Sequence, residues 1–427
     1  MREMKDSGIE WIGEIPAEWT LQRGKTIFAQ RLTKGNQLEI LLAATQKYGM
    51  LPQSEVEGVV QVKEDADLQQ FRTVHRKDFV ISLRSFQGGF EYSQYEGVCS
   101  PAYQVFYNIT PICHNYYRLL FKSDGFIQKM NSMTVGIREG KNIQYSDFAN
   151  SLIPVPPIDQ QQRIADYLDR KCSQIDAIIA RQQEVIEKLK AYKLSVITEA
   201  VTKGLNPDVP MKDSGVEWIG EIPEHWVLIK ATRIIISTQN GLTRRDLDKS
   251  TGQIVLKLRN ISSAGEIDYE YQNRIELTRQ ELDTYRLNEG DFLFVRVNGS
   301  KSLVGKCAIF HSIGEDVAYN DHIIRVRISQ KCMERFFFWY LLSICGKTEI
   351  DLHTSTSAGQ YTISGEGLRD TRLVLPPKTE QIEIDAHLSK ICSSIDKVIL
   401  QKQTSIDKLT AYKKSLIYEV VTGKREV

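Results

Sequence analysis

The chain has 427 residues, with 55 Lys and Arg against 54 Asp and Glu, and a formal net charge of +1. This balance excludes a strongly basic nucleic-acid binder, so any contact with DNA must come from local patches or from a surface shared with a partner. The longest apolar run, Phe336–Cys345, is too short to span a membrane, and Met1–Gly8 lacks the apolar segment of a secretion signal. The seven cysteines have no paired spacing, so we expect a cytoplasmic protein with free thiols.

The chain contains an internal duplication. The segment Met4–Pro16 (MKDSGIEWIGEIP) returns at Met211–Pro223 with one change, and a second pair of similar segments begins at Pro156 and Pro376. Between the repeated segments lie two inserts that resemble each other only faintly. Self-similarity on this scale decides the architecture of a chain. The sequence therefore predicts two similar frames that hold two divergent inserts.

The first repeated segment carries paired tryptophans, Trp11 and Trp19 in one copy and Trp218 and Trp226 in the other. Glycine, proline and two indoles at fixed spacing are typical of an irregular segment that is pinned to a surface by aromatic burial. We expect these residues to pack rather than to carry out chemistry.

The inserts cover about residues 20–151 and 227–371. Short β-like runs between Gly, Asn and Ser clusters predict strands, and two apolar runs predict buried helices, so each insert is expected to be an α+β unit. The expected strands are Val80–Leu83, Ile254–Leu258, Phe292–Val297 and Ile323–Ile328, and the expected helices are Tyr116–Phe121 and Phe336–Ile344.

The two inserts share one local pattern. Asp78–Ile81 followed by Arg84 corresponds to Asp291–Phe294 followed by Arg296, and both runs lead into polar loops. The pattern indicates distant relatives with different loops.

The second repeated segment predicts a long helix. After Pro156 and Pro157, which cannot lie inside a helix, apolar residues recur at steps of three, four and seven, as in a coiled coil. The expected seam residues are Leu168, Ile175, Ile178, Val185, Leu189, Tyr192 and Val196 in the first copy, and Leu388, Ile391, Ile395, Val398, Leu409, Tyr412 and Leu416 in the second.

Two equal seams in one chain are buried most simply against each other. An antiparallel pair is expected if the two inserts lie at opposite ends of the helices. The short stretch Lys203–Pro210, with one glycine and two prolines, is predicted to link the first helix to the second frame. The alternative is that each helix packs only on its own domain.

Catalytic and metal-binding signatures are missing. The sequence contains no His-Glu-x-x-His, Cys-x-x-Cys, Walker loop, Gly-x-Gly-x-x-Gly or Gly-x-Ser-x-Gly. The Pro-Pro pairs follow Val155 and Leu375 rather than the Asn or Asp of an amino-methyltransferase site. We therefore expect a chain that has no catalytic activity of its own and binds no cofactor or metal directly.

The order of the motifs resembles a known family. KDSGxEWIGEIPxxW, a variable region, PPxxxQxxIxxxL and a long helix that ends in AYKxSxIxExVT look like the specificity subunit of type I restriction-modification systems. The resemblance covers nearly the whole chain and both halves. It departs after the Pro-Pro pair, where the family's usual Glu-Gln is Gln160-Gln161 in the first copy and Glu380-Gln381 in the second.

The resemblance implies two target-recognition domains, each reading one half of a split DNA sequence. It also implies a non-catalytic subunit that binds double-stranded DNA and docks two methyltransferase subunits, which use S-adenosylmethionine. Further restriction and translocase subunits of such a complex would use ATP with Mg. No membrane contact is implied.

The expected fold class is accordingly α+β: two α/β target-recognition domains joined by two long helices that form an antiparallel intramolecular coiled coil, with a pseudo-two-fold internal repeat. The predicted segments are residues 1–152 for the first frame segment and recognition domain, 153–203 for the first helical spacer, 204–372 for the second frame segment and recognition domain, and 373–427 for the second spacer.

The candidate DNA-binding residues are polar side chains in the loops of the inserts. Arginine can hold guanine, and Asn or Gln can hold adenine, through paired hydrogen bonds, whereas lysine suits phosphates. The alternative for each candidate is a solvated surface side chain, and the alternative for Arg84 is to hold its loop or a phosphate rather than to read a base. The candidates for bases are Arg84, Gln87, Arg138, Gln144, Arg244, Arg245, Arg296, Asn298 and Gln360, and those for phosphates are Lys47, Lys141 and Lys301.

Two other classes of function remain open. One is a stand-alone DNA-binding protein, and the other is a coiled-coil assembly scaffold without DNA recognition. The near-zero net charge disfavours the first, because few excess cations give weak binding in isolation. The divergence of the inserts disfavours the second, because a scaffold does not require it.

Exchange of residues 20–151 for the corresponding insert of a related chain is expected to change one half of the methylated DNA sequence and to leave the other half intact, because each insert is a separate reader. Mapping of methylated adenines in cells that carry the exchanged chain measures this. A change in both halves would contradict separate readers.

Overall fold

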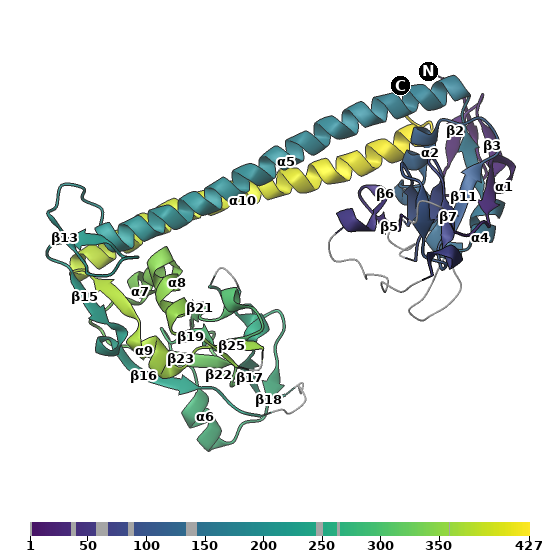
Figure 1. Cartoon of the computed structure of the whole chain (residues 1–427). Helices are drawn as coiled ribbons and strands as arrows, with labels where there is room; N and C mark the ends of the chain where they lie inside the picture. The colour runs from purple at the N-terminus through teal and green to yellow at the C-terminus, as the bar shows by residue number, and fades with distance from the viewer. Residues whose placement is uncertain are drawn as a thin grey trace. The chain divides into compact units, whose positions relative to one another are not determined.

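The computed structural model describes residues 2–35, 40–56, 67–83, 89–133, 143–244, 251–262, 265–357 and 359–427. The chain forms two compact units: unit 1 contains residues 1–183 and 403–427, and unit 2 contains residues 184–402. Each unit thus combines one insert with parts of two long helices, labelled α5 and α10 in Figure 1. Within the described ranges, no helix has both the length and the apolar character needed to cross a bilayer.

The centre of unit 1 is a four-stranded antiparallel sheet in the order β4-β11-β8-β9. The pairs β1-β2, β3-β12, β5-β6 and β7-β10 accompany it. The strands are β1 (Met4–Asp6), β2 (Glu14–Pro16), β3 (Thr20–Arg23), β4 (Phe28–Arg31), β5 (Leu42–Thr45), β6 (Gly49–Pro52), β7 (Arg72–Val74), β8 (Phe79–Ile81), β9 (Phe90–Tyr92), β10 (Gly97–Cys99), β11 (Gln104–Asn108) and β12 (Leu152–Val155). The helices are α1 (Gly24–Ile27), α2 (His114–Leu120), α3 (Asp124–Met133) and α4 (Tyr145–Asn150), with 3-10 turns at Gln53–Glu55 and Leu68–Gln70.

Aromatic side chains fill the core of unit 1. Phe79 of β8 and Phe106 of β11 stack with 5.4 Å between ring centroids, and the ring of Phe28 lies edge-on to both. Phe121, next to α2, and Phe148, in α4, pack against this group. All five rings are buried. Each such pair adds about 0.5–1.5 kcal/mol to the free energy of area burial, so α2 and α4 are held firmly on the sheet.

Unit 2 repeats the central sheet as β16-β23-β19-β21. It adds the sheets β18-β17-β22, in which β17 and β22 are parallel, and β20-β25-β24, with the pairs β13-β14 and β15-β26. The strands are β13 (Met211–Asp213), β14 (Glu221–Pro223), β15 (Val227–Lys230), β16 (Ile235–Asn240), β17 (Gln253–Leu256), β18 (Arg274–Ile275), β19 (Phe292–Val295), β20 (Val297–Asn298), β21 (Cys307–Ile309), β22 (Val317–Tyr319), β23 (Ile323–Ile328), β24 (Ser355–Ser357), β25 (Gln360–Thr362) and β26 (Arg372–Leu375). The helices are α6 (Arg279–Tyr285), α7 (Glu334–Leu342), α8 (Ile344–Leu352) and α9 (Gly365–Asp370), with 3-10 turns at Ala231–Arg233, Leu258–Asn260 and Lys301–Leu303.

The predicted elements of the inserts are present, but two of them are divided. The run Ile323–Ile328 is strand β23 as predicted, whereas Phe292–Val297 is split between β19 and β20. The apolar run Phe336–Ile344 is not one helix, because Ser343 ends α7 and caps α8 by accepting a hydrogen bond from the Gly346 amide over 3.1 Å. Apolar composition predicted burial here, and the serine decided the break.

The long helices are α5 (Ile158–Lys203) and α10 (Lys378–Val421). In unit 1, Lys413 Nζ of α10 lies 2.6 Å from Asp176 Oδ2 of α5. In unit 2, Lys193 Nζ of α5 lies 2.7 Å from Asp396 Oδ2 of α10. The first part of each helix therefore pairs with the last part of the other, so the helices are antiparallel (Figure 1). The predicted fold class is confirmed, and the alternative of unpaired helices is wrong.

The predicted helical seam is only partly correct. Its residues Leu168, Ile175, Leu388, Ile395 and Leu416 are buried. Its residues Ile178, Tyr192, Val398 and Tyr412 are 38–57 % exposed. A straight α-helix drifts away from a strict seven-residue repeat, and both helices also bury a second face against the inserts. The buried stripe therefore turns around each helix and includes Ile186 and Ile406, which the heptad pattern omitted.

The frame holds the start of each long helix through a tryptophan. The indole Nε1 of Trp19 donates to Gln160 Oε1 over 2.8 Å, and that of Trp226 donates to Glu380 Oε2 over 2.9 Å. Gln160 and Glu380 occupy the position at which the first copy departs from the family's usual Glu-Gln. Both supply the acceptor, so the substitution leaves the helix start intact.

A buried glutamine follows at the next position. Gln161 accepts a hydrogen bond from the Cys113 amide and donates one to the Pro156 carbonyl, each over 2.9 Å. Gln381 makes the equivalent bonds in unit 2 at 2.7 and 2.9 Å. One side chain thus joins the helix, the insert and the Pro-Pro segment.

Replacement Gln161→Leu is expected to lower the free energy of unfolding of unit 1 by roughly 2–4 kcal/mol, because it leaves a buried amide and a buried carbonyl unpaired. Urea unfolding followed by circular dichroism measures the change. Gln174→Leu, at an exposed position of the same helix, is the matched control and should stay within about 0.5 kcal/mol. Equal stability of the two variants would refute this role.

Candidate nucleic-acid interface

In unit 2, the small sheet β20-β25-β24 collects candidate residues that lie far apart in the sequence. Asn298 of β20 faces Tyr361 of β25, and the Ile363 amide donates to the Arg296 carbonyl over 3.0 Å. Gln360 begins β25, and Lys301 follows β20 in a 3-10 turn. The backbone therefore places four of the six candidates of the second insert on one sheet and its adjoining turn.

These four side chains differ in whether they form hydrogen bonds within the protein. Arg296 is half-buried and donates from Nη1 to the Asp321 carbonyl over 2.8 Å, so it holds the turn before β23. Asn298 Oδ1 accepts from the Ser300 amide over 2.9 Å. Gln360 and Lys301 are exposed, and their side chains have no partner within the described ranges. Gln360 and the amide nitrogen of Asn298 are thus available to a ligand with donors and acceptors, and Lys301 to an anion.

Arg244 belongs to a different part of unit 2. Its Nη1 lies 3.2 Å from Glu281 Oε2, and it donates to the Glu276 carbonyl over 3.2 Å. Glu281 also caps α6. The pKa of its carboxyl is held below the usual range, mainly by a hydrogen bond from the backbone amide of Thr278, and to a smaller extent by the Thr278 hydroxyl and the charge of Arg244. Arg244 is therefore paired with an ionised carboxylate, and Arg245 lies outside the described residues.

In unit 1, Arg84, Gln87, Arg138 and Lys141 lie outside the described residues. The fifth candidate of these loops, Gln144, is the N-cap residue of α4.

Gln104, which sequence reasoning missed, lies between the end of β8 and the start of α4 in unit 1. Its Nε2 donates to Gln144 Oε1 over 2.8 Å, and its Oε1 accepts from the Tyr145 amide over 2.7 Å. It also faces Ile81, the last residue of β8. The end of β8 and the start of α4 therefore meet at one polar side chain. A glutamine at the start of a β-rich run was the only available signal.

Lys47 lies in the turn between β5 and β6. Its ammonium group is 5.0 Å from the ring centroid of Tyr48, which is itself 65 % exposed. A hydrogen bond with Tyr48 is the main cause that raises the pKa of Lys47 above its usual value. Lys47 is therefore an exposed cation at neutral pH, as a phosphate contact requires.

A buried aspartate precedes the third strand of each central sheet. Asp78 accepts two hydrogen bonds from the Arg31 guanidinium, at 2.7 and 3.0 Å. Asp291 accepts two hydrogen bonds from the Arg327 guanidinium at the same distances, and one from the backbone N–H of Asn288 over 2.8 Å. The sequence pattern marked both aspartates, but not their arginine partners. They fix the strands from which the candidate loops leave.

All seven cysteines are free and buried, and burial raises the pKa of Cys99, Cys307 and Cys332 to about 12. These three are therefore thiols at neutral pH. No group of three or more His, Cys, Asp or Glu that could hold a metal ion occurs in the parts of the chain that the structure describes.

Comparisons with known proteins agree with this architecture. Residues 3–188 match the family model of the type I restriction modification DNA specificity domain. The chain is 26 % identical over 306 residues to the EcoKI specificity subunit of Escherichia coli K12, covering 71 % of this chain and 64 % of that protein. It is 28 % identical over 314 residues to the StySPI specificity subunit of Salmonella potsdam, covering 73 % and 66 %. The chain thus spans slightly less than two thirds of these relatives.

Two solved structures share the fold. One is a chain from a study of complex assembly and conformational transition of the type I R-M system, with a TM-score of 0.70, 12 % identity and coverage of 96 % of this chain and 99 % of that one. The other is the HsdS subunit from Thermoanaerobacter tengcongensis, with a TM-score of 0.50, 14 % identity and coverage of 96 % and 98 %.

Two α+β units built on a duplicated frame and an antiparallel helix pair define a two-domain class of protein with an internal repeat. The first part of the chain matches the type I restriction modification DNA specificity domain, and the chain is similar to specificity subunits of type I restriction enzymes.

Replacement Asp291→Ala is expected to lower the free energy of unfolding of unit 2 by about 3–5 kcal/mol, because it leaves the partly buried Arg327 without its carboxylate. Thermal unfolding of the full chain measures the loss. Asp283→Ala, at an exposed position of α6, should behave almost like the wild type. If both variants unfold at the same temperature, the pair does not hold this strand.

Proposed function

We propose that the chain is the DNA sequence-specificity subunit of a type I restriction-modification complex. Each recognition domain reads one half of a bipartite, asymmetric target. One observation carries this proposal. The two copies of the frame form the same contacts, but the inserts that they hold have different polar loops. The bonds of Gln161 and Gln381, and the pairs Lys413–Asp176 and Lys193–Asp396, occupy equivalent positions in the two units. Equal frames favour equal docking, and unlike loops favour different half-sites.

The proposed reading surface in unit 2 is the sheet β20-β25-β24. Gln360 and Asn298 suit adenine edges, and Lys301 suits a phosphate. Arg244 would have to leave Glu281 in order to contact a base, so its contribution is smaller than its residue type suggests. The full set proposed to bind DNA is Lys47, Arg84, Gln87, Arg138, Lys141, Gln144, Arg244, Arg245, Arg296, Asn298, Lys301 and Gln360.

The helix pair is the proposed docking surface for two methyltransferase subunits. Ile178 and Tyr412 are exposed on the helices of unit 1, and the equivalent residues Val398 and Tyr192 are exposed on those of unit 2. Apolar side chains exposed at equivalent positions suit two copies of the same partner.

The chain itself is proposed to supply no catalytic group and to bind no cofactor directly. Its partners would use S-adenosylmethionine for adenine methylation, and restriction or translocase subunits would use ATP with Mg. The proposed segments are residues 1–152 and 204–372 for the frame segments with their recognition domains, and 153–203 and 373–427 for the helical spacers. A cytoplasmic location follows from this role.

Deletion of the gene is expected to abolish methylation of adenine at one bipartite, non-palindromic sequence, because recognition of that sequence depends on this chain. Single-molecule sequencing of genomic DNA from cells with and without the gene measures the loss.

Restoration by a plasmid copy is the control for this deletion. An unchanged methylation pattern in cells that express the methyltransferase subunits would refute the proposal. Such a result would favour a scaffold without DNA recognition.

A further inference from the structure

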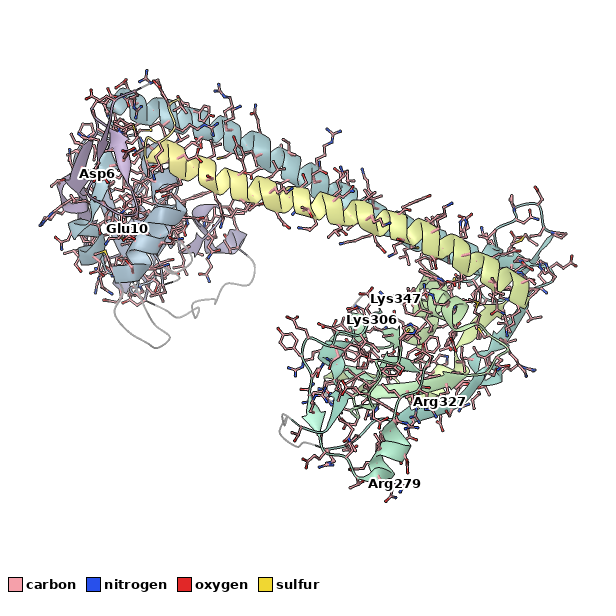
Figure 2. The ribbon with its side chains drawn as sticks, turned by 180° about the vertical axis from the view of Figure 1, so that it is seen from behind. Asp6, Glu10, Arg279, Lys306, Arg327 and Lys347 are labelled. Atoms are coloured by element: carbon pink, nitrogen blue, oxygen red, sulfur yellow. The ribbon has the colours of Figure 1, made fainter. Side chains whose placement is uncertain are left out.

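Unit 2 contains a hollow of about 120 Å³ between the turn that follows β20 and the helices α7 and α8. Val304, Cys307 and Ile350 line it and are buried. Lys306 and Lys347 also line it, but Lys306 is half-buried and Lys347 is exposed. Figure 2 shows both lysines on one side of unit 2, away from Arg279 and Arg327. Two lysines therefore share one hollow on the surface.

The two ammonium groups are not neutralised by any residue that the structure describes. Neither Lys306 nor Lys347 forms an ion pair or a side-chain hydrogen bond with any residue in the described ranges, and the same holds for the neighbouring Lys301. Other basic side chains of unit 2 are paired, as in Arg372–Glu349 and Arg274–Glu315. In a chain with a net charge of only +1, three unpaired lysines in this region form a local positive patch.

A glycine lets the turn that carries Lys306 pack against α8, the helix that carries Lys347. Gly305, which precedes Lys306, has a φ of +74°, and a Cβ at this position would collide with the side chain of Ile350 in α8. The chain before β21 can therefore approach the helix that carries Lys347. Because this approach depends on contact between Gly305 and the buried side chain of Ile350, the position of the turn that carries Lys306 is set by the fold.

The patch is continuous with the proposed reading sheet. Asn298 accepts from the Ser300 amide, and the Ser300 hydroxyl lies 3.0 Å from that of Ser302, which lines the hollow. The chain then passes through Lys301 and reaches Lys306 after five residues. A DNA strand whose bases lie on β20 and β25 would thus run past these lysines.

We propose that Lys306 and Lys347 form a phosphate clamp that binds the DNA backbone beside the half-site read by unit 2. This inference rests on the proposed function and deepens it. Phosphate contacts carry no sequence information, but they fix the register and orientation of a protein on the duplex. The clamp presents Gln360 and Asn298 to the bases without itself choosing a sequence.

The test is DNA binding by the full chain in complex with its methyltransferase subunits, with Lys306→Gln and Lys347→Gln combined. Two duplexes of equal length are used, one with the methylated target and one without it. The affinity for the two duplexes should fall by the same factor, on the order of tenfold at about 0.1 M salt. The slope of log K against log salt should become smaller in magnitude by about two, because two contacts that release counterions are lost. The sequence methylated in cells should stay the same.

Two control variants separate charge from folding. Lys331→Gln removes an exposed lysine from the turn between β23 and α7 and should change neither affinity nor salt slope. Lys306→Arg combined with Lys347→Arg keeps both charges and should bind as the wild type does. An unchanged salt slope in the Gln variant, or a loss confined to the target duplex, would overturn the clamp. The clamp would also be overturned if the Gln variant failed to bind the methyltransferase subunits in the absence of DNA. That result would assign the patch to the methyltransferase subunits.

The wild-type complex distinguishes the two levels of inference. If it shows no preference between the two duplexes, the proposed function itself fails. If the wild-type complex prefers the target duplex, and the Gln variant has the same affinity and salt slope as the wild type, only the clamp fails.

Discussion

Each unit is completed by a helix from the other half of the sequence, and the rest of the structure depends on this exchange. In unit 1, Val420 and Val421 of α10 are fully buried in the core that contains Phe126, and the Tyr116 hydroxyl donates to the Val421 carbonyl over 2.9 Å. In unit 2, Val201 of α5 is fully buried in the core that contains Trp226. Neither core can close from one contiguous half of the chain, so both halves must fold together.

This exchange separates the constant parts of the molecule from the variable parts. The paired helices, the tryptophans of the frame and the buried glutamines form the same contacts twice, so their residue types are tightly constrained. The ion pairs Asp78–Arg31 and Asp291–Arg327 hold the strands of the central sheets that precede the polar loops. Polar residues on the loops can therefore differ between the units while the supporting strands keep their places.

Sequence patterns predicted the elements better than they predicted side-chain roles. The Pro-Pro pairs and the long apolar periodicity located both helices, because proline and helical periodicity act locally. The seam failed at Ile178 and Tyr192, because each helix buries two faces and a heptad pattern describes one. Among the candidate residues, Gln360 is exposed and free of partners within the described ranges, whereas Arg296 is engaged by a distant carbonyl.

The amino-acid sequence alone established the duplication, the two long helices, the family resemblance and the polar character of the insert loops. These features depend on residue identity and short-range spacing, and both can be read along one chain. The tertiary structure decided which cations have a hydrogen-bond or ion-pair partner. Arg244 and Arg296 meet partners that lie far along the chain, whereas Lys306 and Lys347 share a hollow and meet none within the described ranges. Whether a cation has a partner depends on distances in space, and these distances exist only once the chain has folded.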